Sequence, residues 1–141
     1  MRTLITATLF SAVAATVAVF GAASLEAKPR LTPQQQLDKL LEGREAGKPV
    51  NCISSWDTRE MRVLDGTAIV YGWGNTIWVN VPKNAKDLDD DDILVTRTSG
   101  SQLCDLDIVH TVDRTGHFTT GFVSLGEFVP YRRVAKVAKA D

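Results

Sequence analysis

The 141-residue sequence has few of the residues that most often carry chemistry, with two cysteines and two histidines. Neither cysteine has a CxxC partner or a nearby histidine, so no zinc motif is recognisable. The formal net charge is −1 and no basic stripe is present, which argues against nucleic acid or anionic lipid as the main partner. A GxSxG elbow and other local catalytic signatures are also missing, and the sequence implies no cofactor.

Only one long apolar run is present, at residues 4–20. Arg2 precedes it and small residues follow, which is the order of a secretory signal peptide. The run is about 17 residues long and only moderately hydrophobic, which is short for a membrane-spanning helix. We therefore predict a signal peptide in residues 1–27, cleaved between Ala23 and Ala27. The protein is then expected to be periplasmic or secreted, without a stable membrane span.

The remaining chain of about 115 residues has the size of one domain. Residues 28–48 are predicted as an N-terminal helix and linker, and residues 49–133 as a disulfide-linked β-rich domain. Residues 134–141 are predicted as a flexible tail, since they contain only alanine, lysine, valine and a terminal aspartate.

Cys52 and Cys104 are predicted to form one structural disulfide, because an even number of cysteines in an oxidising compartment usually pairs. The bridge would close a loop of about 53 residues and stabilise the fold by about 4 kcal/mol. Two separate buried thiols are the alternative. Trp56, close to Cys52, is expected to pack on the disulfide.

A helix is predicted to begin at Thr32, which can cap it, with Pro33 in the first turn and Gln35 completing a capping box. Three leucines at helical spacing give it one apolar face: Leu37, Leu40 and Leu41. Gly47 and Pro49 are expected to end the segment. The helix is expected to cover part of a sheet rather than to bind a partner.

From residue 60 onward the sequence is rich in β-branched and aromatic residues. Asp65-Gly66 predicts a two-residue hairpin turn that places Leu64 opposite Thr67. A second turn at residues 72–75 places Tyr71 opposite Thr76. This register gives one apolar face, made of Met61, Val63, Ala68, Val70, Ile77 and Val79. The other face is mixed and contains Glu60, Arg62, Leu64, Thr67, Ile69, Tyr71, Thr76, Trp78 and Asn80.

Further strands are predicted after a polar connection at residues 82–92. Residues 93–97 form one short strand, and residues 104–112 form an alternating strand. Cys104, Leu106, Ile108, His110 and Val112 share the apolar face of that alternating strand. Residues 118–131 are expected to give one or two strands, broken near Gly121 and Gly126. The fold class is therefore α+β and mainly β, with the helix packed on an antiparallel meander sheet or a small open barrel.

The segment Thr98-Ser-Gly-Ser-Gln-Leu-Cys104-Asp-Leu-Asp107-Ile-Val109, preceded by Cys52 and the Asp65-Gly-Thr67 hairpin, resembles a group of small exported proteins of Gram-negative bacteria. These proteins are classed as a domain of unknown function, and the resemblance covers roughly residues 48–131. It implies export and a β-rich fold but carries no activity. Members often have additional cysteines, so any second bridge is absent from this chain.

Asp87, Asp89 and Asp91 match the first three ligand positions of a calcium loop. However, Asp92 replaces the glycine and Thr98 the bidentate glutamate, which excludes an EF-hand. A looser calcium site is one interpretation. The preferred one is a solvated acidic loop that prevents a strand edge from pairing with other molecules.

His110 and His117 are the only histidines, and a small hydrolase using either is one hypothesis. His110 on an apolar strand face is more typical of a hydrogen-bonded core residue. We therefore expect that the protein is not an enzyme.

A candidate binding patch consists of Tyr71, Trp73, Trp78 and Arg62, and such a patch could stack on a sugar or anchor a protein. Alternatively, the N-terminal helix covers this face and Trp78 is core. The sequence favours a non-enzymatic binding or envelope-associated module, with a periplasmic protein or wall glycan as partner. An inhibitor of a wall-degrading enzyme is the other alternative, which a protruding loop at Trp73 would favour.

Overall fold

The computed structural model describes residues 29–98 and 100–135. The predicted signal peptide and residues 136–141 of the predicted tail lie outside these ranges. Val134, the first tail residue, donates its backbone N–H to the carbonyl of Gly43 at 3.1 Å. None of the described helices has the length and hydrophobicity needed to cross a bilayer.

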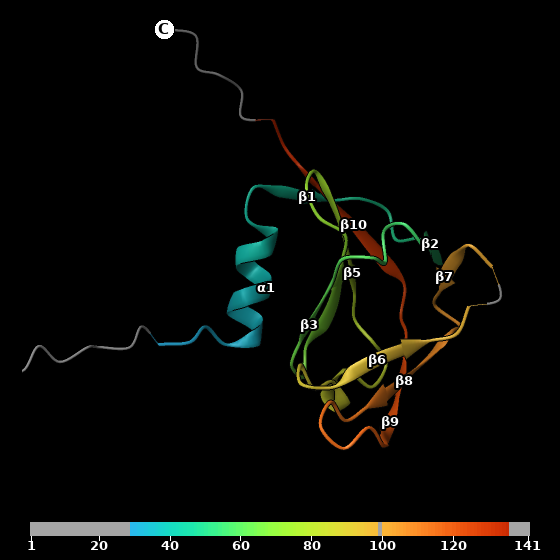
Figure 1. Cartoon of the computed structure of the whole chain (residues 1–141). Coiled ribbons are helices and arrows are strands. Elements are labelled where there is room, and N and C mark those ends of the chain that lie inside the picture. The colour runs from blue at the N-terminus through green and yellow to red at the C-terminus, as the bar shows by residue number, and fades with distance from the viewer. Residues whose placement is uncertain (1–28, 99, 136–141) are drawn as a thin grey trace, which may run out of the picture.

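The described residues are mainly β, with antiparallel sheets and one α-helix, as predicted. The elements are α1 (Pro33–Leu41), β1 (Arg44–Ala46), β2 (Cys52–Ser54), β3 (Met61–Leu64), β4 (Ala68–Tyr71), β5 (Thr76–Asn80), the 3₁₀ turn η1 (Ala85–Asp87), β6 (Ile93–Thr96), β7 (Gln102–Cys104), β8 (Ile108–Val112), β9 (Thr119–Ser124) and β10 (Phe128–Arg133). These strands are divided among three sheets, with orders β1-β10-β5-β4-β3, β2-β7 and β6-β8-β9 (Figure 1).

The capping box of α1 is confirmed. The Thr32 hydroxyl accepts the N–H of Gln35 at 3.2 Å, and the Gln35 side chain accepts the N–H of Thr32 at 2.9 Å. The helix is shorter than predicted, because Gly43 turns the chain with φ +70°. The following residues of the predicted linker form β1, which pairs with β10.

The predicted register between β3 and β4 is wrong by one residue. The turn contains three residues, 65–67, since Leu64 pairs with Ala68 and the N–H of Thr67 donates to the carbonyl of Leu64 at 2.9 Å. A one-residue shift moves every side chain of a strand to the other face. Leu64 therefore lies with Ala68 and Val70, whereas Met61 and Val63 lie on the opposite face.

The register between β4 and β5 differs from the prediction by two residues, so that Tyr71 pairs with Trp78. An even shift keeps each side chain on its predicted face. The apolar face is covered by α1, in a cluster of Leu37, Leu64, Ala68, Val70, Ile77 and Val79. The expectation that the helix covers the mixed face is therefore wrong.

The mixed face is instead covered by the two smaller sheets, which lie on the other side of the large sheet from α1 (Figure 1). The resulting core cluster consists of Ile53, Ile69, Tyr71, Leu88, Leu103, Val109, Val123, Leu125 and Phe128. The large sheet is thus buried on both faces.

The predicted single strand at residues 104–112 is two strands, β7 and β8. Asp107 makes the break, since its carboxylate accepts the N–H of Cys104 at 2.8 Å and its N–H donates to the Cys104 carbonyl at 3.0 Å. The predicted face is wrong after this turn. Val109 is fully buried and Ile108 is 52% exposed, because the turn restarts the alternation.

The predicted disulfide is confirmed, since Cys52 and Cys104 are bonded across directly paired positions of β2 and β7. These strands have three residues each, which is too few for a stable two-stranded sheet on its own. The bridge therefore holds β2 and β7 together, while Ile53 and Leu103 pack the pair against the core.

Replacing both cysteines by serine is expected to lower the free energy of unfolding by about 4 kcal/mol, because the bridge restricts a long loop in the unfolded chain. Urea unfolding of the double variant and of the oxidised protein measures this difference. The reduced wild-type protein is the control and should match the variant. A loss below about 1 kcal/mol would contradict the role assigned to the bridge.

Candidate ligand-binding cleft

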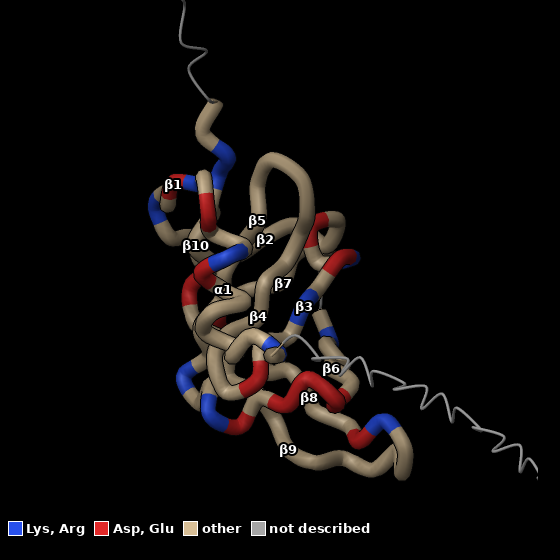
Figure 2. The backbone as a smooth tube through the Cα atoms, turned by 90° about the vertical axis from the view of Figure 1, so that its left-hand side faces the viewer, with Lys and Arg blue, Asp and Glu red and all other residues tan. Residues whose placement is uncertain are grey.

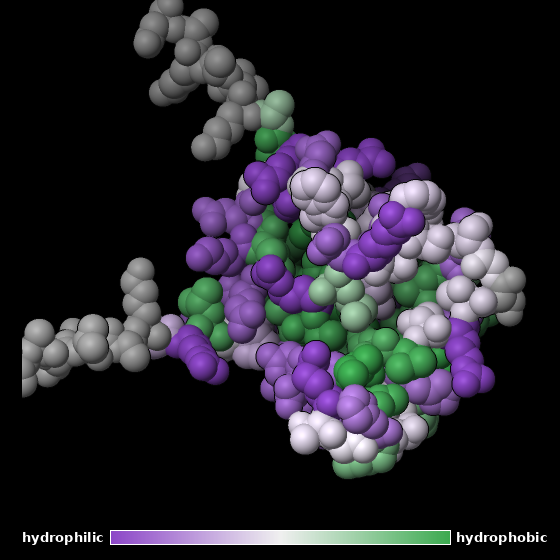
Figure 3. Space-filling view, in the orientation of Figure 1, coloured by the Kyte–Doolittle hydropathy of each residue, from purple (hydrophilic) through white to green (hydrophobic). Residues whose placement is uncertain are grey.

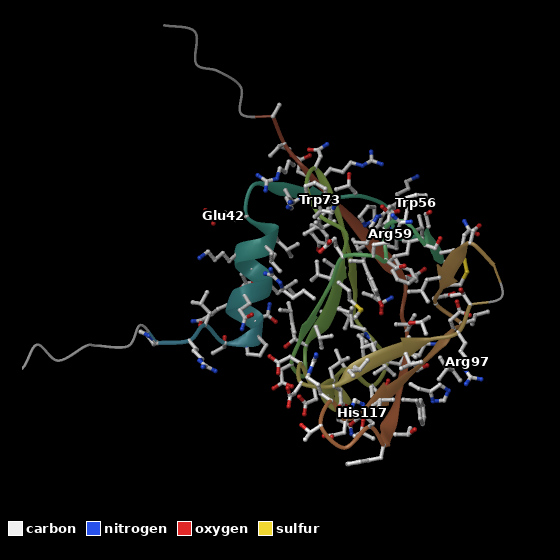
Figure 4. The ribbon with its side chains drawn as sticks, viewed as in Figure 1. Glu42, Trp56, Arg59, Trp73, Arg97 and His117 are labelled. Carbon is white, nitrogen blue, oxygen red and sulfur yellow. A yellow bond between two sulfur atoms is a disulfide. The ribbon has the colours of Figure 1, made fainter. Side chains whose placement is uncertain are left out.

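Two tryptophans are among the most exposed large side chains of the described residues. Trp56 is 70% exposed and Trp73 is 80% exposed. They line one cleft of about 270 Å³, together with Asp57, Arg59, Glu60 and Gly72. Figure 4 shows both indoles and Arg59 at the same end of the molecule.

Trp73 lies in the loop between β4 and β5, between two glycines that both have φ +78°. Non-glycine residues rarely adopt this conformation. The N–H of Gly72 donates to the carbonyl of Glu60 at 2.8 Å. This bond joins the Trp73 loop to the segment that carries Trp56.

Two arginines donate hydrogen bonds to the backbone of the Trp73 loop. The Arg44 guanidinium donates to the carbonyls of Asn75 at 2.9 Å and Gly74 at 2.7 Å. The backbone N–H of Arg133 donates to Asn75 at 2.9 Å, and its side chain donates to Gly74 at 3.2 Å. Partial burial, with the nearby Arg133, lowers the pKa of Arg44. The loop is thus fixed through its backbone, which leaves the indole free.

The Arg59 guanidinium stacks on Trp56, with its central carbon 3.6 Å from the ring centroid. This cation–π contact covers one face of the indole and limits its rotation. Trp56 therefore does not pack chiefly on the disulfide as predicted. The carboxyl groups of Asp57 and Glu60 add hydrogen-bond acceptors to the same cleft.

A second hollow of about 230 Å³ is also lined by Trp73. It shares Glu60 and Gly72 with the first cleft and is also lined by Arg44 and Arg62. Trp73 therefore contributes to two hollows that are both lined by charged residues.

The structure does not bring the four residues of the predicted patch to one surface. Tyr71 is 2% exposed and packs on Phe128, with ring centroids 5.8 Å apart. Trp78 is partly buried against the same cluster. Arg62 is exposed but pairs with Val70 on the opposite face of the sheet. Trp73 and Arg62 are therefore exposed and line one hollow, whereas Tyr71 and Trp78 are not available for binding.

Trp56 and Arg59 are the functional candidates that the sequence interpretation missed. The signal available for them was weak, namely a tryptophan three residues from an arginine in a polar segment. Trp56 and Arg59 line one cleft with Trp73 because of strand pairing, which no local sequence pattern reveals.

The three aspartates of the weak calcium candidate have separate partners. Asp87 accepts from Lys86 at 2.9 Å, and this hydrogen bond lowers the pKa of Asp87. Asp89 accepts the backbone N–H of Asp91 at 2.9 Å. In residues 29–98 and 100–135, no group of three or more potential ligands has the geometry to hold a metal. Residues 89–92 form a continuous acidic stretch, drawn red in Figure 2, directly before β6, which is an edge strand.

The two histidines lie away from the tryptophan cleft. His110 is exposed on β8, between Val95 and Phe122 on the neighbouring strands. His117 has a positive φ of 53° in a turn at the opposite end of the molecule from Trp73 (Figure 4). In the described part of the chain, neither imidazole hydrogen-bonds to a serine or a carboxylate, so the arrangement gives the hydrolase hypothesis no support.

No family model matches the chain, and no curated protein or solved structure is significantly similar to it. Function must therefore be inferred from the site itself.

Acrylamide quenching of single-tryptophan variants is expected to differ among the three indoles. Trp73 should be quenched most, because it is the most exposed. Trp78 should be quenched least, because it packs on the core. Trp56 should be intermediate, because Arg59 covers one face, and Arg59→Ala should raise its quenching. Equal quenching of Trp73 and Trp78 would contradict this arrangement.

Proposed function

We propose that the protein is an exported, non-catalytic binding module of the cell envelope whose Trp56–Trp73 cleft binds saccharide chains of the wall. The observation that carries this proposal is the pair of exposed indoles flanking one cleft with charged hydrogen-bonding groups. An exposed tryptophan leaves a large apolar surface in contact with water, which does not stabilise the fold. Two such residues in one cleft are therefore typical of a binding surface.

The chemistry of a sugar ring suits this cleft. A pyranose presents C–H groups on its faces and hydroxyl groups around its rim, and an indole can pack against the first while polar residues bind the second. Asp57 and Glu60 can accept hydrogen bonds from hydroxyls, and Arg59 can donate to them. The backbone clamp on the Trp73 loop reduces the entropy lost on binding.

The exposure of the carboxyl groups favours binding over hydrolysis. A catalytic acid of a glycosidase is usually kept protonated by an apolar pocket. Glu60 is exposed and Asp57 is only half-buried, so neither has such a pocket. The Cys52–Cys104 disulfide supports export, because such bonds persist in oxidising compartments.

Cosedimentation of the protein with purified peptidoglycan tests this proposal. Trp56→Ala and Trp73→Ala are each expected to weaken binding about tenfold or more, because truncation of a central tryptophan removes most of a contact. Phe118→Ala is the matched control, since Phe118 is 60% exposed but outside the cleft. Unchanged binding by both tryptophan variants, or an equal loss with the control, would refute the proposal.

A protein inhibitor of a wall-degrading enzyme is the second candidate, favoured by the protruding and clamped Trp73 loop. An inhibitor presents a rigid loop to a partner and changes little on binding. Inhibition of lysozyme-type activity should then depend on Trp73 and be insensitive to Trp56→Ala, whereas saccharide binding needs both indoles.

A further inference from the structure

Tyr71 has a buried hydroxyl for which the fold provides no evident use. The residue lies in β4 and is 2% exposed, and burial raises the pKa of its hydroxyl. Within residues 29–98 and 100–135, its hydroxyl has no hydrogen-bond partner, although the ring packs tightly on Phe128. A fully enclosed hydroxyl without a partner would be costly, and the described residues contain no such atom.

The Tyr71 hydroxyl is not fully enclosed by packed side chains. Every fully enclosed side-chain nitrogen or oxygen of the described residues has a partner. Since the Tyr71 oxygen has none, it must reach open space, and Tyr71 lines a cavity of about 250 Å³. The cavity therefore holds a nearly buried polar group with a free donor and a free acceptor.

The lining of this cavity combines apolar and hydroxyl groups without any charge. Met61, Leu94 and Leu103 supply apolar surface, and hydroxyl-bearing residues such as Thr58 and Thr96 supply polar surface. The cavity lies among the segment before β3, β4, β6 and β7. β6 is in front in Figure 1, and hydrophobic residues gather in this region of Figure 3.

This cavity is separate from the tryptophan cleft, although both use residues of the segment 55–60. Ser55 and Thr58 line the Tyr71 cavity, whereas Trp56 and Arg59 line the other cleft. A ligand in one therefore need not touch the other.

We propose that the Tyr71 cavity binds a small uncharged molecule, one ring or a short chain in size, with a hydroxyl or carbonyl group that pairs with the Tyr71 hydroxyl. The size follows from the volume, because an apolar cavity of about 150 Å³ already holds benzene. The absence of charged lining residues disfavours ions, whose desolvation would be uncompensated. The free hydroxyl selects a ligand that can hydrogen-bond.

Phenol and toluene are suitable probes, because they share a ring and nearly a shape but only phenol can hydrogen-bond to Tyr71. Titration of the ¹⁵N-labelled protein should shift amide signals of β4, β6 and β7 saturably with either probe. Tyr71→Phe keeps the ring on Phe128 and should weaken phenol binding about fivefold to tenfold, while toluene binding stays unchanged. Tyr131→Phe is the matched control and should bind phenol like the wild type.

A cavity-filling variant gives a second, independent test. Thr96 is exposed on a strand and lines the cavity, so Thr96→Phe should abolish binding of both probes without lowering the thermal unfolding midpoint. Trp56→Ala and Trp73→Ala should leave phenol binding unchanged. The proposal for the Tyr71 cavity can therefore hold even if the saccharide proposal is refuted. The proposal is overturned if neither probe shifts these strands, or if Tyr71→Phe binds phenol as tightly as the wild type.

Discussion

Burial of β4 on both of its faces is the constraint on which the rest of the domain depends. All four residues of the strand are buried, and apolar surface on either side must be removed from water. α1 covers one side, and the two smaller sheets cover the other. Those sheets are small, and the β2–β7 pair is held by the Cys52–Cys104 bridge. The disulfide thus compensates for strands that are too short to form a stable cover by themselves.

The same sheet positions the proposed binding surface at the end of β4. The Trp73 loop connects β4 to β5, and its carbonyls are bound by Arg44 of β1 and Arg133 of β10. These arginines belong to strands at the beginning and the end of the described chain. The pairing of β1 and β10 beside β5 is therefore what holds the loop in place. An exposed tryptophan on a mobile loop would lose more entropy on binding.

Local signals in the sequence were sufficient for the α1 cap, the strand-rich character and the cysteine pair, because each depends on residues close together or on compartment chemistry. The strand registers and the faces on which the side chains lie were harder to predict from the sequence. The Asp65-Gly66 turn was expected to hold two residues, but it holds three, with Leu64 paired to Ala68. This single difference places Leu64 on the side of the helix. Likewise, Asp107 ends β7 with a side-chain bond that alternation of hydrophobicity does not reveal. The predicted aromatic patch is not formed because the smaller sheets cover the face that carries Tyr71 and Trp78, and the β3–β4 register places Arg62 on the opposite face.

The two halves of the tryptophan cleft are held by different means. Trp56 follows β2, whose position is set by the disulfide, whereas Trp73 is set by the arginine clamp. The direct link between the halves is the hydrogen bond from Gly72 to the carbonyl of Glu60. The spacing of the two indoles therefore depends on the docking of the β2–β7 sheet against β4, which the core around Tyr71 determines. Core packing and surface recognition are in this way coupled through one strand.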